Sequence, residues 1–439
     1  MFKRLLGFDP EKHNVRTEII AGITTFLTMA YILAVNPNNF DTLGGEMSKS
    51  NGAVFTATAL AAVIGTLAMA FIAKKPFALA PGMGLNAFFV YTVCLTMGHS
   101  WQFALTAVFL EGLIFIILTL TKVRSWILNA IPLSLKHAIG AGIGLFIAFI
   151  GLQNAGIIAN NDATLVSLGD LTHGAALLGV IGIIITGALI ILKVRGGILL
   201  GILATTLIGL FIKGPDGAAL THFNGFISAP DSVGPIFCQF EWGSILSWDM
   251  LAVVFTFLFI DMFDTMGTII GVSQKAGMVD EKGNVDGIDK MFMADSIATV
   301  CGACLGTSTT TTYVESASGV GEGGRTGLTA FTAALLFALA LLFSPVFLAI
   351  PGAATAPALV IVGVMMMSPV AKIDWNDYSE SIPAFITVLM MPVAYSISDG
   401  ILLGVISYVL LNACAGKFKK ISVTMWILAA LFICKYIFI

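Results

Sequence analysis

Long apolar runs separated by short charged loops are the feature of this sequence that most constrains its fold. Crossing the hydrocarbon core of a bilayer takes about 20 predominantly apolar residues, and fourteen runs of this kind can be read along the chain. These runs lie at residues 18–36, 53–73, 78–95, 101–121, 134–151, 174–192, 196–213, 247–271, 289–305, 308–324, 327–350, 356–369, 380–396 and 399–415. Since 57% of the 439 residues are hydrophobic and only 11% are charged, the sequence predicts an all-α polytopic membrane protein with fourteen transmembrane segments.

Basic residues indicate the orientation of these segments. The cytoplasmic loops of membrane proteins accumulate Lys and Arg, and the chain begins with Lys3, Arg4, Lys12 and Arg16. Nearly all other basic residues fall in the alternate loops that this start would place inside, so we expect a cytoplasmic N-terminus. A last apolar run at 421–438 could be a fifteenth crossing, but we interpret it as an interfacial helix because it is short and carries a charge near its end.

A stretch without Lys or Arg, residues 214–246, divides the crossings into seven and seven. Because each half has an odd number of crossings, the halves would have opposite orientations, as in the inverted repeats of many transporters. We therefore expect a first repeat at 1–213, an extracytoplasmic linker at 214–246, a second repeat at 247–416, and a C-terminal interfacial helix or extra span at 417–439.

Two crossings at corresponding positions of the halves are interrupted. The third contains Pro76, Pro81, Gly82 and Gly84, which break a continuous helix, and the tenth contains four successive threonines, which favour extended backbone. Irregular backbone is tolerated at membrane depth only where it lines a cavity or is buried in protein. We expect the two half-helices to approach each other near mid-membrane and to present free N–H groups to a ligand.

Two acidic side chains fall at membrane depth, Asp261 in FTFLFIDMFDTMGTIIG and Glu315 in TSTTTTYVESASGVG. Such a side chain costs roughly 2.5–3.5 kcal/mol on insertion scales, so these two residues mark the expected working site. Asp261, Asp264, Thr265 and Thr268 recur at the spacing of one helical face. For Thr268, packing between helices is the alternative to a role in the site.

Glu315 also has a purely structural interpretation. Thr312 followed three residues later by Glu315 fits a capping box, in which each side chain would satisfy a backbone N–H of the half-helix. In the first half, Asn86 occupies a similar place near the start of its own half-helix. Both interpretations of Glu315 remain open from the sequence.

Four stretches resemble a known family, the nucleobase–cation symporters, and within it the AzgA-like purine permeases. They are GITTFLTMAYILAVNP, APGMGLNAFF, FIDMFDTMGT and TTTYVESASGVGEGGRTG, and they are spread over both halves of the chain. The related uracil and xanthine branches have a glutamate in the eighth crossing followed by a histidine four residues later. Asp261 and Thr265 stand at those positions here, so a proton relay assisted by histidine is not expected.

The resemblance implies a core domain, formed by crossings one to four and eight to eleven, and a gate domain formed by the others. It also implies that a purine base lies between the two broken helices, where carboxylates would accept its N–H groups. The expected substrate-binding residues are Asn86, Asp261, Glu315, Thr312, Gly84 and Phe263. Phe88, Phe89 and Phe259 are further candidates for stacking on the base, with core packing as the alternative.

Coupling to an ion gradient requires a group that changes charge during transport. The eighth and tenth crossings contain no histidine and no lysine, so a buried carboxyl group remains. Burial disfavours the charged form of a carboxyl group. Asp261 could therefore take up a proton outside and release it inside. Asp264 could be the proton site instead, or a cap to neighbouring hydroxyls, and both remain open.

These features together predict a secondary active transporter that imports purine nucleobases across the cytoplasmic (inner) membrane by proton symport. Guanine and hypoxanthine are favoured, adenine is a further candidate, and Na⁺ is less favoured than the proton. The expected partners are the base, the proton and membrane lipid, without nucleic acid, and a homodimer is a candidate assembly. No cofactor or metal is expected, since Cys301 and Cys304 have no further Cys or His nearby and we interpret them as structural.

Two other classes were compared with this prediction. An anion transporter or channel on the same seven-plus-seven fold should carry a basic or neutral residue at position 261 or 315, because a buried negative charge repels an anion. An intramembrane aspartyl protease needs two aspartates on separate helices, whereas Asp261 and Asp264 share one. The sequence therefore predicts no enzyme, and the anion transporter or channel is the alternative function.

Overall fold

The computed structural model describes residues 5–121, 131–194, 196–214, 217–223, 225–278 and 285–438. Within them the regular secondary structure is helical, apart from two short antiparallel strand pairs and an isolated bridge between Lys213 and Ala219. It divides into two compact units: the larger comprises Met1–Ile116 and Gly151–Leu359, and the smaller comprises Ile117–Ile150 and Val360–Ile439. The expected repeat and core–gate boundaries are a different division of the chain and stay predictions.

The larger unit contains most of the described helices and helical turns. They are α2 (Val15–Met29), α3 (Ile32–Asp41), α4 (Gly45–Lys49), α5 (Asn51–Ala68), η1 (Met69–Ala73), α6 (Met83–Ala87), η2 (Phe88–Thr96), α7 (Trp101–Leu120), α10 (Gly174–Ile191), α11 (Gly197–Gly209), η3 (Trp242–Ser244), α12 (Trp248–Ala276), α13 (Ile288–Leu305), α14 (Ser316–Gly321), α15 (Gly327–Ala340), η4 (Leu341–Phe343), α16 (Ser344–Leu348) and the start of α17 (Gly352–Met366). The segments η1 and η2 are π-helical, and the other η segments are 3₁₀ turns.

The smaller unit is built on α9 (Leu133–Asn154), η5 (Ser368–Lys372), α18 (Tyr378–Val393), α19 (Ile397–Cys414), η6 (Phe418–Lys420) and α20 (Val423–Phe438). Hydrogen bonds between polar side chains connect α9, α18 and α19. Glu380 accepts hydrogen bonds from the Ser134 hydroxyl of α9, at 2.5 Å, and from the Tyr408 hydroxyl of α19, at 3.3 Å. Asp377, at the N-cap of α18, accepts from Lys417 Nζ at 3.0 Å.

Seven helical segments in the described residues are long and apolar enough to cross a membrane, and four shorter apolar helices accompany them. This agrees with a multi-pass membrane protein, while the count of fourteen crossings stays a prediction. The interpretation of 421–438 as interfacial also stays a prediction. The first crossing is interrupted, because α2 ends at Met29 and α3 begins at Ile32.

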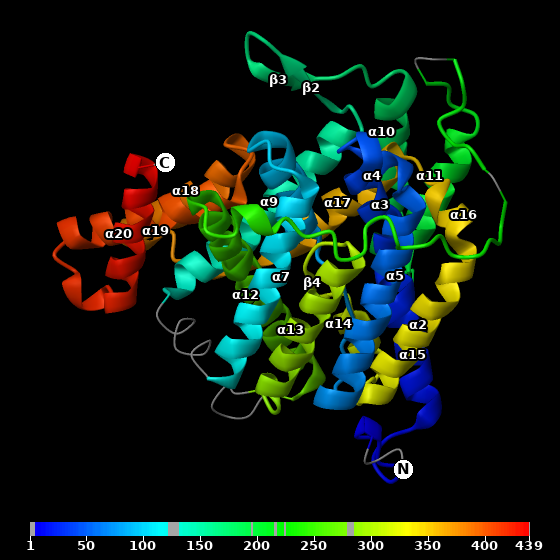
Figure 1. The fold of residues 1–439 in the computed structure, drawn as a ribbon, viewed down its shortest axis with the longest axis horizontal. Coiled ribbons are helices and arrows are strands. Elements are labelled where there is room, and N and C mark those ends of the chain that lie inside the picture. Colours follow the sequence, from blue (N-terminus) through cyan, green and yellow to red (C-terminus); the bar gives the residue numbers. More distant parts are fainter. Residues whose placement is uncertain are drawn as a thin grey trace. The chain divides into compact units, whose positions relative to one another are not determined.

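The two interrupted crossings meet as a pair of short strands inside the larger unit. β1 (Leu79–Pro81) pairs antiparallel with β4 (Thr310–Thr312), in the register Leu79 to Thr312 and Pro81 to Thr310. Each strand leads directly into its half-helix, α6 after β1 and α14 after β4. Figure 1 labels β4 and α14. The expected extended stretch at the threonines and the approach of the two broken segments are confirmed. A second pair, β2 (Ile158–Asn161) with β3 (Leu165–Leu168), forms a hairpin before α10.

Close helix packing surrounds the β1–β4 pair. Helices α5 and α13 pack against both strands, and α12 packs against β4. Helix α15, from the second half of the sequence, packs against α2 and α5 of the first half (Figure 1). At Gly65 of α5, an added Cβ would lie 2.8 Å from Ala298 Cβ and 3.1 Å from Leu79 Cβ, so only glycine lets α5 approach both α13 and β1. Small residues at such contacts are typical of helix packing in membranes.

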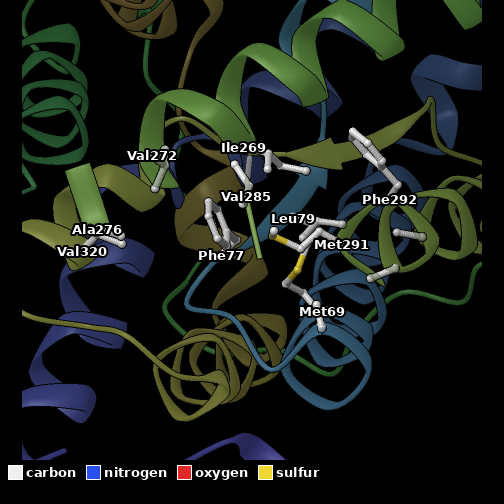
Figure 2. Close-up of a cluster of buried hydrophobic side chains, with 13 residues drawn as sticks. Met69, Phe77, Leu79, Ile269, Val272, Ala276, Val285, Met291, Phe292 and Val320 are labelled. Atoms are coloured by element: carbon white, nitrogen blue, oxygen red, sulfur yellow. The ribbon is translucent and has the colours of Figure 1, made fainter. Parts of the chain in front are cut away.

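An apolar cluster supports one side of the strand pair. It gathers buried side chains from η1, β1, α12, α13 and α14, and Figure 2 shows Leu79 together with Met69 and Met291. Phe77, just before β1, packs in the same cluster with Ile269 of α12. Burial of this surface fixes β1 against α12 and α13, so the strand positions are set by apolar packing on this side.

Candidate functional site

Backbone and side-chain bonds hold the two broken crossings together beyond the strand register. The Tyr313 N–H donates to the Ala78 carbonyl at 3.0 Å, and the Gly82 N–H donates to the Thr309 carbonyl at 2.9 Å. The Tyr313 hydroxyl donates to the Pro81 carbonyl at 2.6 Å. These bonds satisfy backbone groups that water cannot reach at this depth. They give the site a fixed frame.

Glu315 lies where β4 turns into α14, and 6% of its surface is exposed. Its Oε1 accepts a hydrogen bond of 2.5 Å from the hydroxyl of Tyr31, at the break between α2 and α3. The capping-box interpretation was wrong, since Glu315 caps no helix N–H and the Thr312 hydroxyl donates to Asp295 Oδ1 at 3.1 Å instead. Glu315 is therefore oriented by Tyr31 rather than used to start a helix.

Asn86 lies in α6 and is fully buried. Its Oδ1 accepts a hydrogen bond from the hydroxyl of Ser308, which stands just before the threonine run. Its Nδ2 has no hydrogen-bond partner among the described residues. A buried amide donor without an acceptor is costly, so this group is available for an acceptor atom on a ligand.

Asp295 of α13 holds β4 in place. It accepts from the Thr312 N–H at 3.0 Å and from the Thr312 hydroxyl at 3.1 Å. The Thr265 hydroxyl of α12 lies 3.1 Å from Asp295 Oδ2 and 2.9 Å from Asp261 Oδ1, and it also contacts Thr311 Oγ1 at 2.5 Å. Thr265 thus bridges the carboxyl groups of two helices to the strand.

Glu111 of α7 adds a further buried carboxyl group to this network. Its Oε2 accepts a hydrogen bond from the Thr309 hydroxyl at 2.7 Å, and the carboxyl group interacts electrostatically with that of Asp261. Glu111 and Asp261 are both 0% exposed. At the neighbouring Gly112, an added Cβ would lie 3.0 Å from the backbone nitrogen of Val300, so glycine lets α7 approach α13 closely.

The remaining predicted residues divide into three groups. Asp264 is partly buried and interacts electrostatically with Asp261 and Glu315. Thr268 is buried on the same face of α12, as the spacing predicted, and Gly84 is buried within α6. The side chain of Phe263 lies outside the described residues.

The other aromatic candidates contact further aromatic rings. Phe88 packs edge-on against Phe257 with ring centroids 4.8 Å apart, and Phe89 packs on Phe40 at 5.0 Å. Phe259 packs on Phe255 at 4.5 Å. These contacts support the core-packing alternative for the three residues.

Three residues of the network were not predicted: Tyr31, Glu111 and Asp295. Glu111 and Asp295 carry the same signal that singled out Asp261, an acidic side chain inside an apolar run, and the insertion cost applies to them equally. Tyr31 has no comparable signal, because a tyrosine is common near membrane helices. Within the described residues, no group of His, Cys, Asp and Glu side chains has an arrangement that could hold a metal ion.

Comparison with known proteins gives matches over nearly the whole chain. The model of a family described as a permease family, for xanthine and uracil permeases, matches residues 16–403. A putative permease of Methanocaldococcus jannaschii is 48% identical over 98% of both chains. The guanine/hypoxanthine permease PbuG of Bacillus subtilis is 45% identical over 100% of both chains, and the adenine permease AdeP of Escherichia coli is 43% identical over 100% of this chain and 96% of its own.

Among solved structures, the transmembrane domain of the cyanobacterial bicarbonate transporter BicA is similar to this chain. The TM-score is 0.61 at 16% sequence identity, and the match covers 90% of this chain and 98% of that one. At this identity the likeness shows the fold alone. The fold is that of a helical membrane transporter.

Proposed function

The chain belongs to the xanthine and uracil permease family, and from this premise we propose that it imports purine nucleobases by proton symport. It is a multi-pass membrane transporter rather than an enzyme, and the resemblance to purine permeases read from the four motifs is confirmed. Guanine and hypoxanthine are the favoured substrates and adenine a further one. Relatives of nearly equal identity are named for each group.

The main structural support for this proposal is the set of polar groups around the β1–β4 pair. Asn86 Nδ2 is a buried donor without an acceptor among the described residues. Glu315 is a buried carboxyl group held by Tyr31, and Asp264 lies within electrostatic reach of both. One neutral donor and two acidic acceptors therefore surround the start of the two half-helices.

A purine base complements such a set. Its ring N–H groups, and the amino group of guanine, can donate to a carboxylate, which accepts two such bonds. Its carbonyl oxygen or ring nitrogen can accept from an amide donor such as Asn86 Nδ2. The flat faces of the base suit a site with apolar walls. We therefore assign Glu315 and Asn86 to the base, with Asp264 beside them.

Proton coupling is supported by the chemistry of the buried side chains. The network contains the carboxyl groups of Glu111, Asp261, Asp264, Asp295 and Glu315. Several carboxylates cannot all stay ionised at short range in a buried site, so binding of at least one proton is expected. Na⁺ is the less favoured coupling ion.

An anion transporter or channel is the rival function. The fold is shared with a bicarbonate transporter, but a fold alone does not identify the substrate. The acidic side chains around β4 would repel an anion at the same depth. This charge favours a neutral base over an anion.

Competition uptake tests the proposed function. Proteoliposomes or cells carrying the protein should accumulate radiolabelled hypoxanthine, and unlabelled guanine should compete more strongly than adenine, xanthine or uracil. Collapse of the pH gradient with a protonophore should abolish accumulation. Uptake driven equally well by a Na⁺ gradient at constant pH would overturn proton coupling. Inhibition by bicarbonate or sulfate, without inhibition by any purine, would favour the rival.

The topology belongs to the same proposal. We place the N-terminus in the cytoplasm, the protein in the cytoplasmic membrane, and fourteen crossings in two inverted repeats with a core and a gate. Reporter fusions at Lys49, Lys193 and Lys372, one in each of three predicted loops, provide the test. The fusion at Lys49 should report the outer side, and the other two the cytoplasm.

A further inference from the structure

A short segment before α12, residues 236–242, lies against the end of α13 and the first half of α7. We call this segment the strap. On the α13 side, Ile236 is 1% exposed and packs against Gly306, the C-cap of that helix. An added Cβ at Gly306 would lie 2.6 Å from the Ile236 carbonyl oxygen, and Gly306 has a φ of 94°. Only glycine fits both the close approach and this backbone conformation.

On the α7 side, polar and aromatic contacts hold the strap. The Glu241 N–H donates to the Thr106 hydroxyl at 2.8 Å. The ring of Phe240 packs on that of Phe109, with ring centroids 4.8 Å apart. Both Thr106 and Phe109 belong to α7. The strap is therefore fixed on both sides of Cys238.

Cys238 lies beside the last turn of α13. Its N–H donates to the carbonyl of Cys304 at 2.8 Å. The last carbonyls of a helix have no intrahelical partner, so this bond satisfies one of them. Cys238 also has a φ of 51°, in the left-handed region that residues other than glycine rarely adopt. The contacts on both sides of Cys238 hold this turn in place.

The backbone bond brings the two cysteines within the range of a disulfide. Residues that share such a bond in a strand pair have Cα atoms about 5.5 Å apart, and disulfides join Cα atoms about 4.4–6.8 Å apart. The thiol of Cys304 also interacts electrostatically with that of Cys238. Both are free thiols, with Cys238 exposed and Cys304 half-buried. A disulfide between them needs little movement of the backbone.

The position of the strap determines the redox environment of the pair. The strap belongs to the stretch 214–246, which contains no Lys or Arg and which the proposed topology places outside the cytoplasm. Because Cys238 contacts Cys304 directly, both thiols lie at the same end of α13. Disulfides form and persist in oxidising environments outside the cytoplasm. Cys238 is the more exposed thiol, so an oxidant reaches it first.

We propose that Cys238 and Cys304 are a redox-active pair that closes to a disulfide and joins the strap to α13. The pair rests on the proposed topology and does not depend on the transported substrate. It gives Cys304 a role beyond the structural one expected from the sequence.

The reaction is a thiol–disulfide exchange with a disulfide-bearing oxidant of the outer compartment. The Cys238 thiolate attacks one sulfur of the oxidant, which forms a mixed disulfide and releases the other sulfur as a thiolate. The Cys304 thiolate then attacks the Cys238 sulfur and displaces the remaining oxidant thiolate. The protein loses two electrons and two protons, and the oxidant takes them up as its disulfide becomes two thiols.

The disulfide would stabilise the part of the molecule that holds β4. It closes a long loop that contains α12 and most of α13, and closing a long loop lowers the entropy of the unfolded chain. The end of α13 also contacts β4: the Thr299 hydroxyl donates to the Thr310 carbonyl at 3.1 Å. At Gly302, an added Cβ would lie 2.5 Å from Thr310 Oγ1. Joining the strap to α13 therefore restrains the helix that supports the strand.

The first experiment detects the bridge in the wild-type protein, so it does not depend on the folding of a variant. Purified protein in nanodiscs is treated with oxidised glutathione, then with N-ethylmaleimide, and is digested without reductant. Mass spectrometry should find a peptide linked through Cys238 and Cys304, with Cys301 alkylated. Glutathione retained on Cys238 without transfer to Cys304, a link from Cys238 to Cys301, or no reaction at Cys238 would each overturn the proposal.

The second experiment measures the melting temperature of the oxidised protein in detergent, with and without dithiothreitol. Reduction should lower the melting temperature of the wild type by about 3–6 °C. Cys238→Ser removes the bridge, so reduction should leave its melting temperature unchanged. Cys301→Ser, a half-buried thiol one turn before Cys304, is the matched control and should respond as the wild type does. An equal response of Cys238→Ser and the wild type would contradict the stabilising role of the bridge.

Labelling of intact cells separates failure of the pair from failure of the proposed topology. Cys238 should react with a membrane-impermeant maleimide only after treatment with a membrane-impermeant phosphine reductant. Reaction only after permeabilisation would place the strap in the cytoplasm and refute the topology, while a linked peptide in the first experiment would still support the chemistry of the pair. Reaction from outside without reductant would show that Cys238 stays a free thiol in the cell, and this would overturn the proposal while supporting the topology.

Discussion

The two broken crossings have the same backbone and different chemistry. β1 and β4 pair with each other and each leads into a short helix. β1 is made of Leu, Ala and Pro, and its Leu79 belongs to the apolar cluster of Figure 2. β4 is made of three threonines, and two of their hydroxyls contact Asp295. The third crossing, with β1, is therefore held by apolar packing. The tenth crossing, with β4, is hydrogen-bonded to ionisable groups.

The difference continues in the half-helices. The first contributes Asn86, a neutral amide, and the second begins at Glu315, an acid. A neutral group can affect the affinity for a base but cannot change charge with pH. We therefore expect substitutions in the third crossing to alter only the affinity for the base. Substitutions around the tenth crossing should alter the response to protons as well.

The largest effect is expected for Asp295→Ala, which removes the acceptor that holds β4. The N–H and hydroxyl of Thr312 would stay buried without a partner, at a cost of about 3 kcal/mol or more. The variant should show a greatly reduced yield of folded protein and a lower melting temperature in detergent. Asp289→Ala, an exposed acid on the same helix, is the control. Equal melting temperatures for the two variants would show that Asp295 does not hold the strand.

Asp261→Asn should remove gradient-driven accumulation. The amide imitates a carboxyl group that is permanently protonated, so the base can still be bound and exchanged while no proton is released. Uptake in energised vesicles should no longer rise as the external pH falls. If Asp261→Asn still accumulates hypoxanthine, the proton assignment to Asp261 is wrong, and Asp264 must be tested next.

Glu315→Gln should weaken purine binding by about ten- to a hundredfold, because a charged hydrogen bond contributes roughly 1.5–3 kcal/mol. The amide keeps the shape of the side chain and can still accept from Tyr31. Binding of radiolabelled hypoxanthine to the purified variant measures the loss, with Glu322→Gln at the C-cap of the same half-helix as the control. Wild-type affinity would exclude Glu315 as a direct ligand.

The sequence was sufficient for the features that are local along the chain. The threonine run predicted extended backbone, and β4 occupies it. The three-and-four spacing predicted one polar face of α12, and Asp261, Thr265 and Thr268 are buried there together. The glycines and prolines of the third crossing predicted the break at β1. Each of these inferences depends on residues within a few turns of one another.

The sequence was not sufficient for contacts between distant segments. Tyr31 and Glu315 are 284 positions apart, and a periodic pattern shows which face of a helix is polar without showing which helix meets it. Glu111 could have been recognised by its cost in the membrane. Its hydrogen bond to Thr309, 198 positions away, could not have been predicted. That contact depends on the close approach of α7 and α13, which is set by how the two helices pack at Gly112.

A smaller effect is expected for Asn86→Ala. Loss of one neutral hydrogen bond to the base should weaken purine binding roughly three- to tenfold. The dependence of binding on pH should remain that of the wild type, because the amide does not titrate. Binding curves at several pH values check both statements. A shift of the pH midpoint in Asn86→Ala would remove the distinction between the two broken crossings.

The smallest effect is expected for an acid outside the network, Asp377 of the smaller unit. Hydrogen bonds from Ser379, and next from Lys417, hold the pKa of Asp377 well below its ordinary value of 3.8. A lowered folded-state pKa gives stability that is present above the unfolded value and is lost only as the pH falls through the lower, folded value. Between about pH 5 and pH 8 the contribution of Asp377 is therefore constant. Asp377→Asn should lower the melting temperature slightly and equally at both ends of that range, and its pH profile of uptake should match the wild type. A changed profile would mean that the proton response does not originate in the buried carboxyl groups around β4.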